Sequence, residues 1–98
     1  MAKSIIQHNK DKCYLCGKNA NADFFGLDEH HVFFGYNRKT SERFGLKVYL
    51  CHDSCHLNGV HKDAKLCKAL QAKVQKIAMH YYRWDMEAWR AIFGRNYL

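Results

Sequence analysis

The sequence contains no proline, no internal repeat, no low-complexity run and no long apolar stretch after its first residue. We therefore expect neither a secretory signal peptide nor a membrane span, and we predict a cytoplasmic protein with no membrane partner. The chain also lacks a His-x-Glu motif ahead of a Pro-Cys-x-x-Cys, which excludes a zinc-dependent nucleobase deaminase. Its 98 residues fit one small domain with a thin core, because so short a chain buries only about 60–65% of its unfolded surface.

Acidic residues are scarce. The chain has 16 Lys and Arg residues against 9 Asp and Glu residues, a formal net charge of +7. This charge favours a polyanionic partner, of which nucleic acid is the commonest, although a merely basic soluble protein would have the same balance. Residues 1–12 are polar and basic apart from Ile5 and Ile6, and we predict a loose arm there that touches nucleic acid.

Residues 13–98 are predicted to form a single α+β domain, in which two strands precede the helices. The first strand is expected over Leu27–Phe34, where Gly35 ends it, and the second over Leu46–Leu50, running into Cys51. The polar residues 36–44 between them are predicted to be an exposed loop or a short helical turn. This pattern is typical of a β-hairpin that a helix covers.

Two helices are predicted after the strands. A long one should run from about Asp63, its N-cap, to Tyr82, and a short one should begin at Asp85 and stop at Gly94. The apolar stripe of the long helix recurs at three- and four-residue steps and comprises Leu66, Leu70, Val74, Ile77 and Tyr81. The short helix is expected to bury Met86, Trp89 and Phe93. We predict a core unit over residues 13–80, followed by this C-terminal helix at 85–93.

Five cysteines are an unusual number for so short a chain, and four of them form two pairs: Cys13, Cys16, Cys51 and Cys55. Tetrahedral zinc takes four thiolate or imidazole ligands, and two such pairs supply them in a reducing compartment. His52 or His56 could replace one thiolate, and a disulfide-linked or merely buried set remains the alternative. The spacing does not fit a Cys2His2 zinc finger, because Cys55 adjoins His56 directly. Cys67 is expected to be a small apolar residue of the long helix.

The motif Glu29-His30-His31-Val32, at the predicted strand, points most sharply to chemistry. Hydrolysis of a phosphodiester needs an activated water, a Lewis acid on the phosphate and help for the leaving oxygen. Imidazole titrates near neutrality, so it can take a proton from water. Adjacent strand residues point to opposite faces, but a twisted strand end lets one histidine bind a metal while its neighbour acts as base. Two further histidines, His56 and His61, follow the second cysteine pair and could reach the same metal.

The order of these motifs, from Cys13 to His61, resembles the HNH endonuclease superfamily. A Cys-x-x-Cys pair is followed by His-His at a strand end, then by Leu50-Cys51-x-x-x-Cys55-His56, Gly59-Val60-His61 and a helix. Within the superfamily it is similar to small phage-borne HNH proteins and to the Ref-type recombination nucleases of phages. The resemblance implies a ββα-metal fold that a structural zinc clamps, beside one catalytic divalent metal (Mg²⁺, Mn²⁺, Ni²⁺ or Zn²⁺), in a bacterial host cytoplasm.

Carried over to this chain, the resemblance implies that His31 is the general base. His30, His56 and His61 would bind the catalytic metal, which would neutralise charge on the phosphate and stabilise the departing 3′ oxygen. The family's middle asparagine, which orients the base, normally comes shortly before the second strand, where this chain has Gly45-Leu46-Lys47. Asn37 is the nearest asparagine, and it lies earlier than the family's position.

Three basic residues between the strands, Arg38, Lys39 and Arg43, are predicted to hold a DNA backbone without selecting a sequence. An ordinary solvated surface is the alternative for this loop. We therefore predict a metal-dependent DNA endonuclease of low intrinsic specificity, in which a phage or host partner protein or a DNA structure chooses the site. The competing hypothesis is a non-catalytic zinc module that binds nucleic acid or a protein. The sequence leaves open whether the protein is a monomer or a homodimer.

Overall fold

The computed structural model describes residues 3–19 and 26–98, and it confirms the predicted α+β class. Strands β1 (Leu27–His31) and β2 (Lys47–Cys51) form a two-stranded antiparallel sheet, in which His30 pairs with Val48. β1 is three residues shorter than predicted. Val32 and Phe33 are fully buried, and they lie in a bend that follows the strand. The chain therefore leaves the strand directly after the two histidines.

The connection between the strands holds a short 3-10 helix, η2 (Gly35–Asn37), and one short α-helix, α1 (Arg38–Arg43). The prediction of a short helical turn is therefore confirmed. α1 ends at Phe44, and Gly45 turns the chain back into β2 with a φ of 71°. Gly45 also packs against the N-terminal segment so closely that a Cβ there would lie 2.2 Å from the carbonyl oxygen of Lys3.

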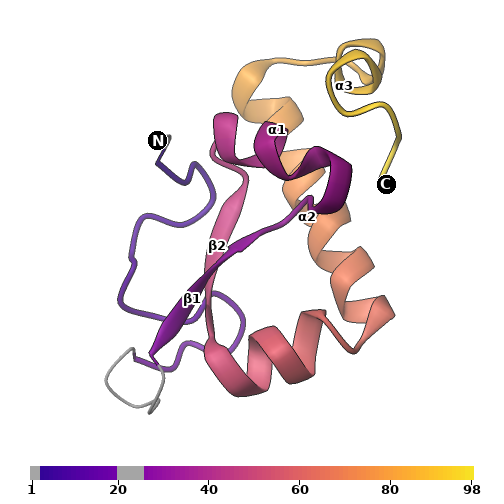
Figure 1. Ribbon diagram of the computed structural model, residues 1–98. Coiled ribbons are helices and arrows are strands. Elements are labelled where there is room, and N and C mark those ends of the chain that lie inside the picture. The colour runs from indigo at the N-terminus through magenta and orange to yellow at the C-terminus, as the bar shows by residue number, and fades with distance from the viewer. Residues whose placement is uncertain (1–2, 20–25) are drawn as a thin grey trace.

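The N-terminal segment runs along the outer edge of β2, so the prediction of a loose arm is wrong (Figure 1). The Ile5 amide donates to the Gly45 carbonyl at 3.0 Å, and the Tyr49 amide donates to the Gln7 side chain at 2.7 Å. The Ser4 hydroxyl donates to the Lys47 carbonyl. A two-stranded sheet leaves free backbone groups on both edges, and this segment satisfies those of β2.

Two helices follow the sheet where they were predicted, and a third, which precedes them, was not predicted. η3 (His52–Val60) is a π-helix, α2 (Ala64–Tyr82) is the long helix, and α3 (Met86–Phe93) is the last. The side chains of Asp63 and Asp85 accept backbone N–H groups at the starts of α2 and α3, as expected of N-caps. Gly94 ends α3 with a φ of 80°. None of the helices in the described ranges is long and apolar enough to cross a membrane.

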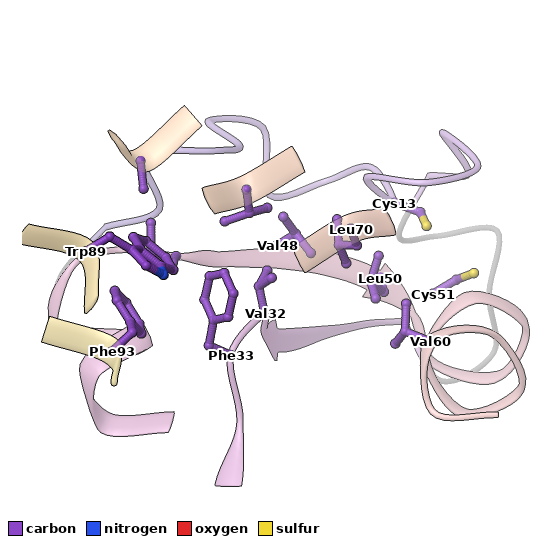
Figure 2. Close-up of a cluster of buried hydrophobic side chains, with 13 residues drawn as sticks. Cys13, Val32, Phe33, Val48, Leu50, Cys51, Val60, Leu70, Trp89 and Phe93 are labelled. Atoms are coloured by element: carbon purple, nitrogen blue, oxygen red, sulfur yellow. The ribbon is translucent and has the colours of Figure 1, made fainter. Parts of the chain in front are cut away.

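The core lies between the sheet, α2 and α3 (Figure 2). Leu70 of α2 faces Val48 and Leu50 at one end of this cluster, and Phe33, Trp89 and Phe93 form its aromatic end. The ring centroids of Phe33 lie 5.3 Å from Trp89 and 5.1 Å from Phe93, so the predicted burial of Trp89 is confirmed.

The predicted stripe of α2 is right at Leu70 and Val74 but wrong at Tyr81, which is 60% exposed. The neighbouring Tyr82 packs against the core instead and donates its hydroxyl to the Phe44 carbonyl. Gln75 is fully buried, so the inward face of α2 includes this residue as well as Leu70 and Val74. Its side-chain amide donates to Asn96 and accepts the Tyr97 amide, so the face that it lies on turns toward the C-terminal tail.

Candidate metal centres

Four cysteine thiols meet where the N-terminal segment, the end of β2 and η3 come together: Cys13, Cys16, Cys51 and Cys55. Their sulfur atoms all lie within 4.8 Å of one another, and the Cys16 and Cys51 sulfurs are 3.8 Å apart. Zinc–sulfur bonds of about 2.3 Å at tetrahedral angles place the sulfurs roughly 3.8 Å apart. All five cysteines lie in the described ranges, and all are free thiols. The four thiols are therefore close enough to bind a metal ion such as zinc.

The electrostatics of the cysteine cluster also fit a cation. Burial raises the pKa of Cys13, but backbone amides of Cys16, Cys51 and Leu15 outweigh this and lower it to about 6. Burial and the neighbouring thiols raise the pKa of Cys55 far above its usual value. Four sulfurs at this distance cannot all become thiolates without a positive charge between them. Zinc supplies that charge and deprotonates its thiol ligands.

Neither candidate substitute for a thiolate lies in this cluster. The Nδ1 atoms of His52 and His56 face Asp28 instead. Cys67, the fifth cysteine, lies on α2 outside the cluster, where burial raises the pKa of its thiol. The cysteine cluster is therefore the four-thiol set that the pairing in the sequence predicted.

A second cluster brings together His30 of β1, His56 of η3 and His61, the residue that follows η3. One ring nitrogen from each lies within 4.8 Å of the other two, and the Nε2 atoms of His56 and His61 are 3.0 Å apart. Hydrogen bonds in a π-helix join residues five apart, and here the His61 amide donates to the His56 carbonyl. The five-residue spacing thus brings the two rings together, with centroids 4.6 Å apart and planes tilted by 58°. His61 precedes α2, which begins at Ala64.

His30 is the buried member of this histidine cluster, at 4% exposure. Burial, and then the neighbouring His56 and His61, lower its pKa to about 4, so the imidazole is neutral at physiological pH. Its Nε2 atom is buried and has no hydrogen-bond partner among the described residues. Buried polar atoms are nearly always paired, so this nitrogen fits a ligand to a metal ion.

Asp28 contacts a ring of the histidine cluster through a hydrogen bond to His56, and the sequence analysis missed this residue. Its carboxylate lies 2.8 Å from Nδ1 of His56 and 2.6 Å from Nδ1 of His52. Burial opposes its ionisation, but the hydrogen bonds from His56 and His52 prevail and lower the pKa of Asp28. A carboxylate that accepts Nδ1–H fixes the tautomer and leaves Nε2 free to bind a metal. Asp28 and His30 are two residues apart on β1 and so share a face, which is the signal that would have found it.

His31 lies on the other face of β1 and packs among charged side chains. Its Nε2 atom is 3.7 Å from carboxylate oxygens of both Glu29 and Glu42. The buried Lys47 ammonium lies 2.8 Å from Glu42 and 3.4 Å from Glu29, and it holds the pKa of the Glu42 carboxyl below its usual value. Nε2 of His31 is buried and makes no hydrogen bond with a described residue, so the two carboxylates act on the ring through their charge. Glu42 and Lys47 were also missed, because only the fold brings α1 against the sheet.

Both neighbouring histidines line one small hollow of about 200 Å³ at the end of β1. Its wall is completed by Glu29, Phe34, Arg38, His56 and His61. Of the three basic residues predicted to hold DNA, Arg38 therefore lies at the hollow. Lys39 and Arg43 are exposed on α1, and the Arg43 guanidinium lies over the Phe44 ring.

The structure gives Asn37 a different role from that of a residue that orients a base. Its side chain is buried, and its amide nitrogen donates to the Phe93 carbonyl at 3.0 Å and to the Tyr97 hydroxyl at 2.9 Å. Asn37 thus ties η2 to the C-terminal tail. It is not part of the wall of the hollow that contains His31.

Comparison with models of known protein families, with curated proteins and with solved structures found no match to this chain.

Proposed function

We propose that the protein is a metal-dependent endonuclease of the HNH type, with a ββα-metal core, that hydrolyses DNA phosphodiester bonds. One observation carries the proposal: an imidazole from β1 and two from the segment 56–61 converge at one point, where the buried Nε2 of His30 has no partner among the described residues. A divalent ion bound by His30, His56 and His61 would supply Lewis-acid chemistry at a phosphate. The excess of basic residues supports an anionic polymer as substrate.

Asp28 has a positioning part in this proposal. It accepts the Nδ1–H of His56 and so presents the Nε2 lone pair of that ring to the point where the three imidazoles meet. Asp28 itself stays ionised because of its two histidine neighbours. The geometry is thus set before any substrate arrives, which lowers the reorganisation needed during the reaction.

His31 is the proposed general base, and the surrounding charges select its tautomer. The carboxylates of Glu29 and Glu42 near Nε2 favour a proton on that nitrogen. The lone pair is then on Nδ1, which would accept the proton of the attacking water. In this proposal the two carboxylates, held by Lys47, replace the orienting asparagine of the family pattern.

Arg38 is proposed to bind the phosphodiester backbone, since its side chain lines the same hollow as the histidines. A guanidinium offers two parallel N–H groups to a phosphate, so it both attracts and orients the substrate. Lys39 and Arg43 would extend this contact along α1.

Plasmid cleavage by the zinc-loaded protein with added Mg²⁺, Mn²⁺ or Ni²⁺ tests the proposal. We expect metal-dependent nicking that chelation of the added ion stops and that His31→Ala abolishes. His80→Ala is the matched control, because His80 is exposed near the end of α2 and should cleave like the wild type. Zinc content must be equal in all three proteins. Absence of cleavage with every metal, at full zinc content, would contradict the nuclease proposal.

The second candidate is a zinc module that binds nucleic acid without cutting it. The specific observation in its favour is that Asn37 is engaged by the C-terminal tail, so the family's usual orienting residue is missing from the hollow. Intact DNA binding without cleavage in the experiment above would favour this candidate.

A further inference from the structure

A groove runs along α2 beside the histidine cluster and has no part in the function proposed so far. It encloses about 700 Å³, and its floor is made of small side chains of α2, among them Ala64, Ala69 and Ala72. The C-terminal tail, with Arg95 and Tyr97, forms the opposite wall. This volume is within the roughly 300–1,000 Å³ typical of sites that bind a small organic molecule.

Phe34 lines both the groove and the hollow that contains His30 and His31. Its side chain lines the groove, the hollow with the histidines and a third depression beside Tyr36 and Tyr97. The Phe34 ring centroid lies 6.2 Å from that of His30 and 6.2 Å from that of His61. The residue is 46% exposed and is not part of the buried core. A large apolar ring therefore remains open to solvent next to the proposed reaction site.

The charge of the groove is complementary to phosphate. The described residues that line it include two cations, Lys68 and Arg95, both exposed, and no Asp or Glu. Arg38 adds a third cation on the other side of Phe34. An exposed aromatic ring between cations is the arrangement that holds single-stranded nucleic acid, because bases stack on the ring while the cations follow the backbone.

Resting on the nuclease function proposed above, we propose that Phe34 and this groove bind an unpaired nucleotide next to the scissile phosphate. The base stacks on Phe34, and Lys68 and Arg95 hold the phosphates that follow it. A base within a duplex is covered by its neighbours on both sides and cannot reach the ring without unstacking. The substrate class is therefore DNA with accessible bases, such as single strands, flaps or locally melted duplex.

Binding measured by fluorescence anisotropy tests this inference without requiring cleavage. The probes are a labelled single-stranded oligonucleotide of about 12 nucleotides and the duplex of the same sequence, added to zinc-loaded protein without a second divalent ion. We expect the single strand to bind more tightly than the duplex. Phe34→Ala should weaken single-strand binding by roughly 5- to 150-fold, since stacking on an aromatic ring contributes about that much per base. Phe34→Tyr keeps a ring and should bind nearly as well as the wild type.

Tyr81→Ala is the matched control and should leave binding unchanged, because Tyr81 is also an exposed aromatic residue but lies at the far end of α2. The salt dependence gives an independent readout. Each of Lys68→Ala and Arg95→Ala should lower the slope of log affinity against log salt by about 0.7, whereas Lys76→Ala, elsewhere on α2, should not.

Three results would overturn the inference. One is unchanged single-strand binding by Phe34→Ala, and another is equal loss of single-strand and duplex binding in that variant. The third is a dimer in sedimentation that Phe34→Ala dissociates without affecting DNA binding, which would assign the groove to a second copy of the chain. Failure of the nuclease proposal is separate, because it is detected as absence of cleavage while Phe34-dependent binding persists.

Discussion

The cysteine cluster and the histidine cluster differ in what surrounds them. The cysteine cluster joins two parts of the chain that are distant in sequence. One part contains Cys13 and Cys16, and the other runs from Cys51 to Cys55. Cys13 and Cys51 are buried and belong to the core cluster (Figure 2). The histidine cluster lies at the surface end of β1, and its His61 is exposed. Each cluster thus has a buried and an exposed member, since Cys16 and His61 are exposed, but only the cysteine cluster contributes residues to the hydrophobic core.

From this difference we infer that the two clusters have different functions. A closed four-thiol site has no position for a substrate and contributes to folding, while a three-histidine site leaves coordination positions open. In the described residues the sheet has two strands, and an isolated hairpin is marginal in water, so a zinc ion bound by the cysteine cluster would add stability that the small sheet lacks. The Asp28 carboxylate lies behind His56 of the histidine cluster, an arrangement that would orient this ring if it binds a metal.

The largest expected effect tests whether the cysteine cluster stabilises the fold. Cys51→Ser should unfold the protein, because metal binding in such small domains supplies about 10 kcal/mol or more of apparent folding free energy. Far-ultraviolet circular dichroism and zinc content measure the loss. Cys67→Ser is the control, since Cys67 lies outside the cluster and should keep both zinc and fold. A folded, zinc-free Cys51→Ser protein would erase the distinction between the two centres.

The next effect tests whether the histidine cluster binds a divalent ion that cleavage requires. His61→Ala removes an exposed imidazole from the histidine cluster, so we expect loss of cleavage and of binding of the added divalent ion, at unchanged zinc content and melting temperature. Titration calorimetry with Mn²⁺ or Ni²⁺ and plasmid nicking measure the two losses. If the variant instead loses zinc or unfolds, the histidine cluster has a structural duty as well.

Asp28→Asn should have an intermediate effect. The variant keeps the shape of the side chain but cannot carry the negative charge that two histidine Nδ1 atoms face. Removal of a partner that orients a metal-binding histidine typically costs about 10- to 100-fold in metal affinity or activity. The same calorimetry and nicking assays apply, and wild-type values in the variant would mean that Asp28 serves only to anchor η3.

Asn37→Ala should have the smallest effect on chemistry and a clear one on stability. It leaves the buried Phe93 carbonyl without its donor, at a cost of about 1–3 kcal/mol. Thermal unfolding measures this loss. We expect the cleavage rate below the melting transition to stay within a few-fold of the wild type, and a loss of cleavage by orders of magnitude would restore Asn37 as the residue that orients the base.

Much of this arrangement could be predicted from local signals. Helices α2 and α3 and their caps follow from Asp63, Asp85 and Gly94, and the cysteine pairs predict their own cluster. These features depend on residues that are neighbours in sequence or on the simple valence of a metal. The three candidate histidine ligands were also chosen from spacing and resemblance, and the structure brings them together.

What the sequence did not show depends on contacts between distant segments. Lys47 was taken as an ordinary strand residue, yet its ammonium is buried between two carboxylates, one of which α1 contributes. Asn37 was weighed for its chemistry, but the C-terminal tail sixty residues later engages it. The N-terminal segment was expected to be loose because its side chains are polar. The free backbone groups at a strand edge, however, form hydrogen bonds with a polar segment as readily as with an apolar one.

The π-helix has one more consequence, which concerns the length of the chain rather than its chemistry. Cys55 and His56 are consecutive residues of η3, so ligands of the two centres are attached to neighbouring points of one backbone. An inserted or deleted residue between Cys51 and His61 would shift one set of ligands against the other. We therefore expect this stretch to accept new side chains at exposed positions such as Leu57, but to vary very little in its number of residues.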